Sequence, residues 1–331
     1  MTARTEAVGS PGPYERRTSN APAGVEPGGV DGGVLLDELT VVVGGARHEA
    51  RFIVDEALAL GPGVSRPGVV PAGAVVMARA RAARRATGEP LQYVFGHWPF
   101  RTLDLQVDPR VLIPRPETEQ VVEVALGEAR RLSAFRPGVA LVAVDAGTGS
   151  GAIALALATE LGAGALKQIW ATDSSAGALA VAAVNLDATR AAGRHRQPPV
   201  ELPPVELTEG SWLDPLPDEL RGGVDLVVSN PPYVAAGEWA GLDPEVKAEP
   251  RRALVAGPGR DGAAGLADVE AVLEQARLWL GRPGAVVVEL APHQSNSARG
   301  RARELGYDEV RVEPDLAGRD RALVAWLRGA Q

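Results

Sequence analysis

Apolar residues follow three patterns along the chain, and the last of them, short strands alternating with helices, is regular from about residue 140. In residues 34–90 they recur at helical spacing between Gly and Pro residues, as in "LLDELTVVV" and "VVMARARAARRA". This spacing predicts a small helical domain. In residues 91–112, aromatic and β-branched residues alternate with polar ones, as in "YVFGHWPFRTLDLQV". That alternation predicts a β-hairpin that links the helical domain to the rest of the chain.

The remainder of the chain, residues 113–331, alternates short apolar runs with helical segments. The runs include "ALVAVDAG", "QIWATD", "VDLVVSN" and "AVVVEL". Strand and helix in this alternation predict an α/β fold with a doubly wound, mostly parallel sheet. Such sheets bind ligands beyond the carboxyl ends of their strands. We therefore expect the polar residues that follow these runs to face one crevice.

Composition and charge narrow the classes of protein. Residues 1–33 contain eleven Gly or Pro residues and little to bury, which predicts a disordered tail. The net charge of −8 counts against tight binding to long nucleic acid. The chain has no cysteine and only four widely spaced histidines, so we expect no metal site. No run approaches the ~20 apolar residues of a membrane span, and the N-terminus lacks a signal-peptide core, which predicts a soluble, cytoplasmic protein.

A glycine-rich loop follows the strand that ends in "VDAG". Its residues are Gly147, Thr148, Gly149, Ser150 and Gly151. Glycines adopt positive φ and let the backbone approach a ligand closely. Asp173, at the end of the next strand, can accept hydrogen bonds from both hydroxyls of a ribose, so loop and carboxylate together predict a nucleoside ligand. Gly147, Gly149 and Ala152 also fit the dinucleotide pattern G-x-G-x-x-G/A, which leaves a nicotinamide cofactor open.

A later strand ends in Asn230, Pro231, Pro232 and Tyr233, a sequence that fits methyl transfer to a planar nitrogen. The Asn230 side-chain oxygen and the Pro231 carbonyl can each accept one N–H of an amide, and the two prolines restrict the backbone that presents them. The Tyr233 ring can lie flat against the amide. S-Adenosylmethionine carries its methyl on a sulfonium leaving group, so the site mainly has to align the reacting atoms. We therefore expect S-adenosylmethionine as the cofactor.

Several motifs together resemble one family. They are "GEPLQYVFGHWPF", "LIPRPETE" (112–119), "DAGTGSGAIALA", "SNPPY" and "DLAGRDR" (315–321). From about residue 34 to 328 the chain is similar to the HemK/PrmC family of release factor N(5)-glutamine methyltransferases. The "NPPY" tetrapeptide alone is shared with nucleic-acid base methyltransferases, whereas its combination with "IPRPETE" and "AGRDR" is much more specific.

The resemblance implies an architecture and a substrate. The architecture is a Rossmann-like class I S-adenosylmethionine-dependent methyltransferase domain, preceded by a helical domain that binds the protein substrate. The substrate is the glutamine of the Gly-Gly-Gln motif in class 1 peptide chain release factors. No direct contact with nucleic acid or with a membrane is expected.

The resemblance also implies roles for individual residues. Cofactor binding is implied for the glycine loop, Asp173, Trp212 and Asn230, and binding of the glutamine amide for residues 230–233. Family members often have an aspartate before the tryptophan, where this chain has Ser211. Arg115 and Glu119 fall in a loop that the family packs over the cofactor.

Three alternatives remain open. Two are methyltransferases: one that modifies a ribosomal-protein glutamine, and one that modifies the amino group of adenine or guanine in nucleic acid. The base methyltransferase predicts a target-recognition insertion and a basic groove, and neither is evident between Gly151 and Asn230. The third, from another class, is a nicotinamide-dependent oxidoreductase or an inactive nucleoside-binding module.

Overall fold

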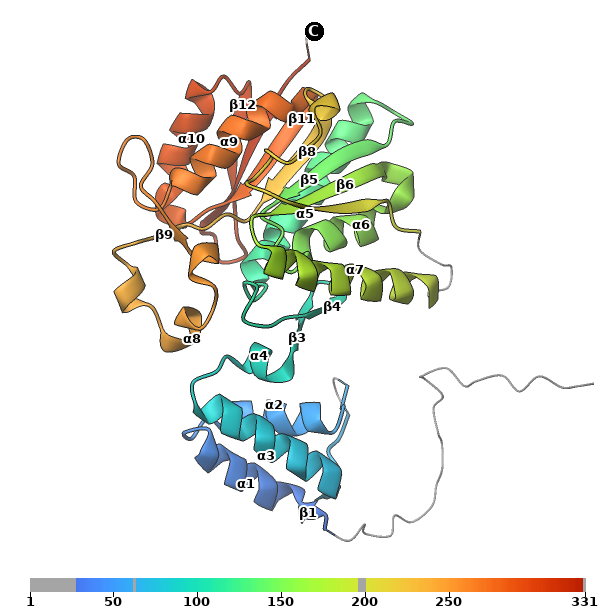
Figure 1. Cartoon of the computed structure of the whole chain (residues 1–331), viewed down its shortest axis with the longest axis vertical. Helices are drawn as coiled ribbons and strands as arrows, with labels where there is room; N and C mark the ends of the chain where they lie inside the picture. Colours follow the sequence, from blue (N-terminus) through green and yellow to red (C-terminus); the bar gives the residue numbers. More distant parts are fainter. Residues whose placement is uncertain (1–27, 62–63, 196–200, 330–331) are drawn as a thin grey trace, which may run out of the picture. The chain divides into compact units, whose positions relative to one another are not determined.

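The computed structural model describes residues 28–61, 64–195 and 201–329, and the chain divides into two compact units at Ala82/Ala83 (Figure 1). Most of the predicted disordered tail, residues 1–27, lies outside the described residues. Residues 28–33 of that predicted tail include the first strand and the start of the first helix.

The first unit is helical, as its apolar spacing predicts. Its elements are β1 (Val30–Asp31), α1 (Gly32–Val42), α2 (Arg47–Ala57), β2 (Val69–Val70) and most of α3 (Ala72–Ala86). The Asp31 carboxylate begins α1 by accepting the N–H groups of Gly33 and Val34 at 2.9 and 3.0 Å, which satisfies donors that have no partner within the helix. β1 pairs antiparallel with β2. Leu35, Leu39 and Ile53 are fully buried between the helices.

The second unit begins with the predicted hairpin and continues with strands and helices in alternation. Its helices are α4 (Leu91–Phe95), α5 (Pro116–Phe135), α6 (Ala152–Ala165), α7 (Ala176–His195), α8 (Pro244–Lys247), α9 (Ala267–Trp279) and α10 (Ser295–Glu304). Its strands are β3 (His97–Phe100), β4 (Leu103–Gln106), β5 (Leu141–Ala146), β6 (Leu166–Asp173), β7 (Val205–Glu209), β8 (Val224–Ser229), β9 (Val234–Ala235), β10 (Val255–Ala256), β11 (Leu280–Glu289), β12 (Glu309–Pro314) and β13 (Asp320–Leu327).

The hairpin is shorter than its predicted range. Residues 91–95 form α4, and Gly96, with φ of +83°, ends that helix before β3 begins. A left-handed residue of this kind closes a helix and suits glycine. β3 and β4 then pair antiparallel, from His97 opposite Gln106 to Phe100 opposite Leu103.

Seven strands form the main sheet, in the order β12-β13-β11-β8-β5-β6-β7. β13 is antiparallel to both of its neighbours, and the other pairs are parallel. The predicted α/β fold with a doubly wound, mostly parallel sheet is therefore confirmed. The chain moves outward from β5 through β6 to β7 and then returns to β8 on the other side of β5. That reversal opens a crevice at the carboxyl ends of β5 and β8.

Helices cover both faces of this sheet, with α5, α6 and α7 on one face and α9 and α10 on the other (Figure 1). Alternate residues of β11 show how the sequence achieves this. Val287 packs with α5 and α6, whereas Val286 and Val288 pack with α9 and α10. All three are fully buried, and burying each such side chain contributes ~1.5–3 kcal/mol. The apolar run "AVVVEL" thus reflects a strand that is covered on both sides.

Candidate active site

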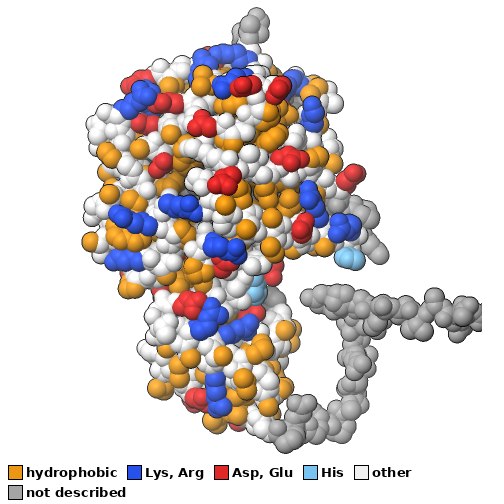
Figure 2. Space-filling view, in the orientation of Figure 1, with side chains coloured by type: hydrophobic (Ala, Val, Ile, Leu, Met, Phe, Trp, Pro, Cys, Tyr) orange, Lys and Arg blue, Asp and Glu red, His pale blue; other side chains and the backbone are white. Residues whose placement is uncertain are grey.

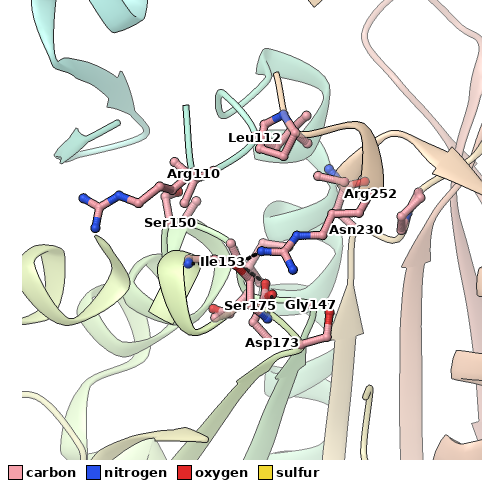
Figure 3. Close-up of a pocket in the computed structure, with 18 of the residues that line it drawn as sticks. Arg110, Leu112, Gly147, Ser150, Ile153, Asp173, Ser175, Asn230 and Arg252 are labelled. Atoms are coloured by element: carbon pink, nitrogen blue, oxygen red, sulfur yellow. Dashed lines mark hydrogen bonds between the residues drawn. The ribbon is translucent and has the colours of Figure 1, made fainter. Parts of the chain in front are cut away.

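A cavity of about 340 Å³ lies at the carboxyl ends of β5, β6 and β8 (Figure 3). It brings together most of the predicted site residues, namely Gly147, Thr148, Gly149, Ser150, Asp173, Trp212, Asn230 and Pro232. Gly151, Pro231 and Tyr233 do not line it. Gly151 instead begins α6, and Pro231 is buried beneath the turn. The glycine loop and the "NPPY" segment therefore face one crevice.

The glycine loop is held by hydrogen bonds at both ends. The N–H groups of Gly147 and Thr148 both donate to the Thr172 carbonyl, at 2.9 and 2.8 Å. The Thr148 hydroxyl donates to Asp145 Oδ2 at 2.6 Å. Burial raises the pKa of Asp145 to about 7, although the bonds from Thr148 and from the Ala154 N–H favour its carboxylate form. Gly147, Gly149 and Gly151 have φ of +80°, +57° and +86°, a conformation that other residues adopt only with strain.

Asp173 joins the loop to the end of β6. Its Oδ2 accepts the Gly149 N–H at 2.9 Å, and its Oδ1 accepts the Ser175 N–H at 2.9 Å. Each carboxylate oxygen has a second lone pair for a ligand hydroxyl. Burial raises the pKa of Asp173, and the nearby Arg252 opposes that shift. Figure 3 shows Arg252 extending toward Ser175, to whose hydroxyl it donates.

Trp212 forms a flat wall of the cavity over the glycine loop. A Cβ atom on Gly147 would lie 3.0 Å from Cζ3 of the Trp212 ring, so only glycine permits this close approach. Trp212 itself has φ of +48°. The Thr172 hydroxyl holds this strained backbone by donating to the Trp212 carbonyl at 2.6 Å. An indole held flat beside the half-buried Asp173 carboxylate fits an adenosine, with the base against the ring and the ribose near Asp173.

Asn230 stands at the opposite side of the cavity, directly after β8. The Ser229 hydroxyl ties β8 to β5 by donating to the Ala146 carbonyl at 2.6 Å. The Asn230 Nδ2 group donates to the hydroxyl of Thr118 at 3.1 Å, which leaves Oδ1 as the remaining acceptor of the side chain. Behind it, the Tyr233 carbonyl accepts from Gln294 at 3.2 Å. Tyr233 is half-buried, and its burial raises the pKa of its hydroxyl to about 12.

The "LIPRPETE" segment contributes a further wall. Leu112, Pro114, Arg115 and Thr118 line the cavity. Arg115 forms an ion pair with the buried Glu249, which also accepts the Ile113 N–H at 2.9 Å. Glu119 does not line the cavity; it accepts the Arg101 N–H at 2.8 Å and so holds the turn of the β3–β4 hairpin.

Sequence reasoning missed several residues of this cavity, and two of them, Thr118 and Arg252, make polar contacts with predicted site residues or beside them. Thr118 lies inside a motif that was singled out, but its contact with Asn230 joins residues 112 positions apart. Arg252 lies in "EPRRAL", a segment without a recognisable binding pattern. Among the described residues, no group of three His, Cys, Asp or Glu side chains is placed to hold a metal ion. Within the same residues, no helix has the length and hydropathy needed to cross a membrane.

These features fit one cofactor. The cavity has the Trp212 ring and the Asp173 carboxylate on one side and the Asn230 amide on the other, an arrangement that fits an adenosine beside a site of methyl transfer. The sheet order and this arrangement define a class I S-adenosylmethionine-dependent methyltransferase with a Rossmann-like fold. Which member of the class it is follows from its relatives.

The chain belongs to the release factor glutamine methyltransferase family. It is 41% identical over 248 residues to the release factor glutamine methyltransferase of Moorella thermoacetica, covering 74% of this chain and 77% of that one. The Streptomyces coelicolor protein of the same name is 39% identical over 73% of this chain and 78% of its own length. The Cereibacter sphaeroides protein is 35% identical over 86% of this chain and 92% of its own. No family model matches the chain.

Solved structures are more distantly similar. A methyltransferase from Pyrococcus furiosus is 18% identical, with a TM-score of 0.45 over 69% of this chain and 91% of that chain. The E. cuniculi Mtq2–Trm112 complex, described as responsible for methylating the eRF1 translation termination factor, is 18% identical, with a TM-score of 0.40 over 66% and 99%. The family assignment rests on the curated relatives, and the fold assignment on the sheet order.

Proposed function

We propose that this protein transfers the methyl group of S-adenosylmethionine to the side-chain amide nitrogen of the glutamine in the Gly-Gly-Gln motif of class 1 peptide chain release factors. The proposal rests on the position and hydrogen bonding of Asn230. Its amide lines the cofactor cavity, and its Nδ2 group is already committed to Thr118. Its Oδ1 is therefore available to hold an amide N–H of the substrate.

Two hydrogen-bond acceptors hold the amide of the substrate glutamine. In this proposal Asn230 Oδ1 accepts one N–H of the glutamine amide, and the carbonyl of Pro231, a residue outside the cavity lining, accepts the other. Proline at 231 and at 232 fixes φ and restricts the residue before each, so the two oxygens keep their directions. When bound, S-adenosylmethionine supplies an electrophilic methyl on a sulfonium leaving group. The residues of the site align the amide nitrogen with it and exclude water.

The helical first unit is proposed to bind the release factor away from the reacting glutamine. It exposes several large apolar side chains, among them Val34 at 61%, Phe52 at 55% and Val76 at 68% exposure. Scattered exposed apolar residues are common, but several on one small unit favour a protein partner.

On the face of the second unit that Figure 2 shows, acidic and basic side chains are interspersed. This mixture favours a protein substrate over nucleic acid. Translation, and so the proposed activity, takes place in the cytoplasm.

One labelling experiment tests the substrate. The protein is incubated with S-adenosylmethionine carrying a labelled methyl group, together with a release factor, ribosomal proteins or ribosomal RNA. We expect label in the release-factor peptide that contains Gly-Gly-Gln, with a mass increase of one methyl on the glutamine. A release factor with that glutamine replaced by alanine is the control and should remain unlabelled. Label in a ribosomal protein or in RNA, with none in the release factor, would replace the proposed substrate.

A further inference from the structure

The Asn230 amide is the end of a buried chain of hydrogen bonds. Asn230 Nδ2 donates to Thr118 Oγ1 at 3.1 Å, and the Thr118 hydroxyl donates to Glu289 Oε2 at 2.8 Å. Thr118 is 4% exposed and Glu289 is fully buried. The chain links three elements, because Asn230 follows β8, Thr118 lies in the first turn of α5, and Glu289 ends β11.

The sheet and the start of α5 determine this meeting. β11 runs parallel to β8, with Val288 opposite Ser229. The next residues, Glu289 and Asn230, therefore leave neighbouring strands at the same edge of the sheet. α5 begins at Pro116, and the hydroxyl of Thr118 in its first turn is within hydrogen-bond distance of both Glu289 and Asn230. The contacts among Asn230, Thr118 and Glu289 thus depend on the pairing of β11 with β8 and on the N-terminus of α5.

The donors and acceptors of the three groups determine the direction of the hydrogen bonds between them. An ionised carboxylate only accepts hydrogen bonds, and a hydroxyl has a single proton to donate. Thr118 therefore donates to Glu289 and can only accept from Asn230, which must turn its Nδ2 edge toward Thr118 and its Oδ1 edge away. We infer that Thr118 and Glu289 are positioning residues that fix which edge of the Asn230 amide faces the substrate. This inference rests on the proposed function, in which Oδ1 holds the glutamine amide.

The direction of these hydrogen bonds depends on whether Glu289 is protonated, and the charged groups around Glu289 influence its pKa. Arg321 of β13 and Arg115 before α5 favour the carboxylate, Glu117 of α5 opposes it, and the Tyr233 hydroxyl lies in the same electrostatic environment. Arg321 is itself engaged by Asp315 at 3.5 Å and by the Leu290 carbonyl at 3.2 Å.

Burial is the largest influence, and it raises the pKa of Glu289 to about 7. A protonated Glu289 can donate to Thr118 Oγ1, which frees the Thr118 proton to be donated to Asn230 Oδ1. Such a reversal would occupy the acceptor that the substrate needs. Methyl transfer should therefore fall as the pH drops below about 7.

The first test removes the hydroxyl of Thr118 without changing its shape. In Thr118→Val, kcat for release-factor methylation should fall roughly 10- to 100-fold, because a mispositioned reactant is costly. The KM for the release factor and the Kd for S-adenosylhomocysteine should change little, whereas the melting temperature should fall, because the buried Glu289 loses its hydrogen bond from Thr118. Thr118→Ser restores the hydroxyl and should restore kcat to within about threefold of the wild type.

Thr159→Val is the matched control for that variant. Thr159 is also a helical threonine, but it donates to the Leu155 carbonyl within α6 at 2.7 Å, outside the cavity. Its replacement should leave kcat unchanged. A Thr118→Val protein whose kcat stays within twofold of the wild type would overturn the inference.

The second test uses the pH profile. The wild type should lose kcat on the acid side with a midpoint near pH 7, whereas Glu289→Gln, which cannot take up a proton there, should lack that decline. The same acid limb in both proteins would contradict a role for Glu289.

A third measurement separates this inference from the proposed function. If the wild type methylates no release factor, the proposed function fails, but the orientation of the amide is still measurable. The side-chain ¹⁵N–¹H signals of Asn230 in the complex with S-adenosylhomocysteine should change between pH 6 and pH 8 in the wild type and not in Thr118→Val. Signals that are pH-independent in the wild type, or equally pH-dependent in both proteins, would show that the chain of hydrogen bonds does not orient the amide.

Discussion

Gly265 lies against the backbone of Tyr233 so closely that a Cβ atom on it would stand 2.2 Å from the Tyr233 carbonyl oxygen. The same oxygen accepts a hydrogen bond from Gln294 Nε2, which also donates to the Ala264 carbonyl at 2.9 Å. Gly265 has φ of +66°. The segment 230–233 is therefore supported from behind by a contact that only glycine allows.

Gly265→Ala should displace this segment and lower kcat by at least tenfold. The added methyl collides with main chain, which cannot move without shifting residues 230–233. Gly262→Ala is the matched control, because Gly262 has φ of +81° and no atom within 4 Å of an added Cβ. The control should lose only the ~1–2 kcal/mol of stability that a left-handed alanine costs and keep its activity. Equal kcat in the two variants would rule out the collision as the cause.

Asn230→Ala should reduce turnover far more than cofactor binding. Losing a positioned acceptor of this kind commonly costs ~2–4 kcal/mol of transition-state stabilisation. The Kd for S-adenosylhomocysteine, measured by isothermal titration, should stay within a few fold of the wild type. Full activity in Asn230→Ala would refute the two-acceptor arrangement but would not affect the family assignment.

Asp173→Ala should weaken S-adenosylhomocysteine by roughly 1.5–3 kcal/mol, the usual value of hydrogen bonds to a charged group. Part of the loss comes from the loop, because Asp173 also accepts the Gly149 N–H. Isothermal titration of both proteins at one pH measures the difference. An unchanged Kd would place the ribose elsewhere in the cavity.

Glu289→Gln should change how stability depends on pH. The pKa of Glu289 is about 7 in the folded chain and about 4.3 for an unperturbed glutamate. Between these values the folded chain holds a proton that the unfolded chain lacks, so the stability from Glu289 is present at low pH and falls as the pH rises through this window. The glutamine variant does not titrate.

The stability difference between the two proteins should follow from that titration. From pH 5 to pH 8, the free energy of unfolding of Glu289→Gln should rise relative to the wild type by an amount on the order of 2 kcal/mol. Urea unfolding at the two pH values measures it. A difference that does not vary with pH would mean that Glu289 keeps an ordinary pKa.

The sequence predicts the sheet and the place of the cavity, because each depends on local patterns. The apolar runs 141–146 and 224–229 are strands, and the residues directly after them meet, as parallel strands require. Other features depend on distant partners. The hydrogen bonds from Asn230 to Thr118 and from Thr118 to Glu289 require the register of β11 beside β8, which no local spacing encodes. The strained backbone of Trp212 depends on the Thr172 hydroxyl, and residues 91–95 become helical where alternation predicts a strand.

The hydrogen bond from Ser229 to Ala146 joins two strand ends that lie 83 positions apart in the chain. In the proposed function, one of these strands carries the loop for the methyl donor, and the other carries the acceptor for the methylated group. Separation of β5 from β8 would break this bond and the pairing of the two strands, and it would move the two groups apart. Both sides of the site therefore depend on the same contact in the middle of the sheet.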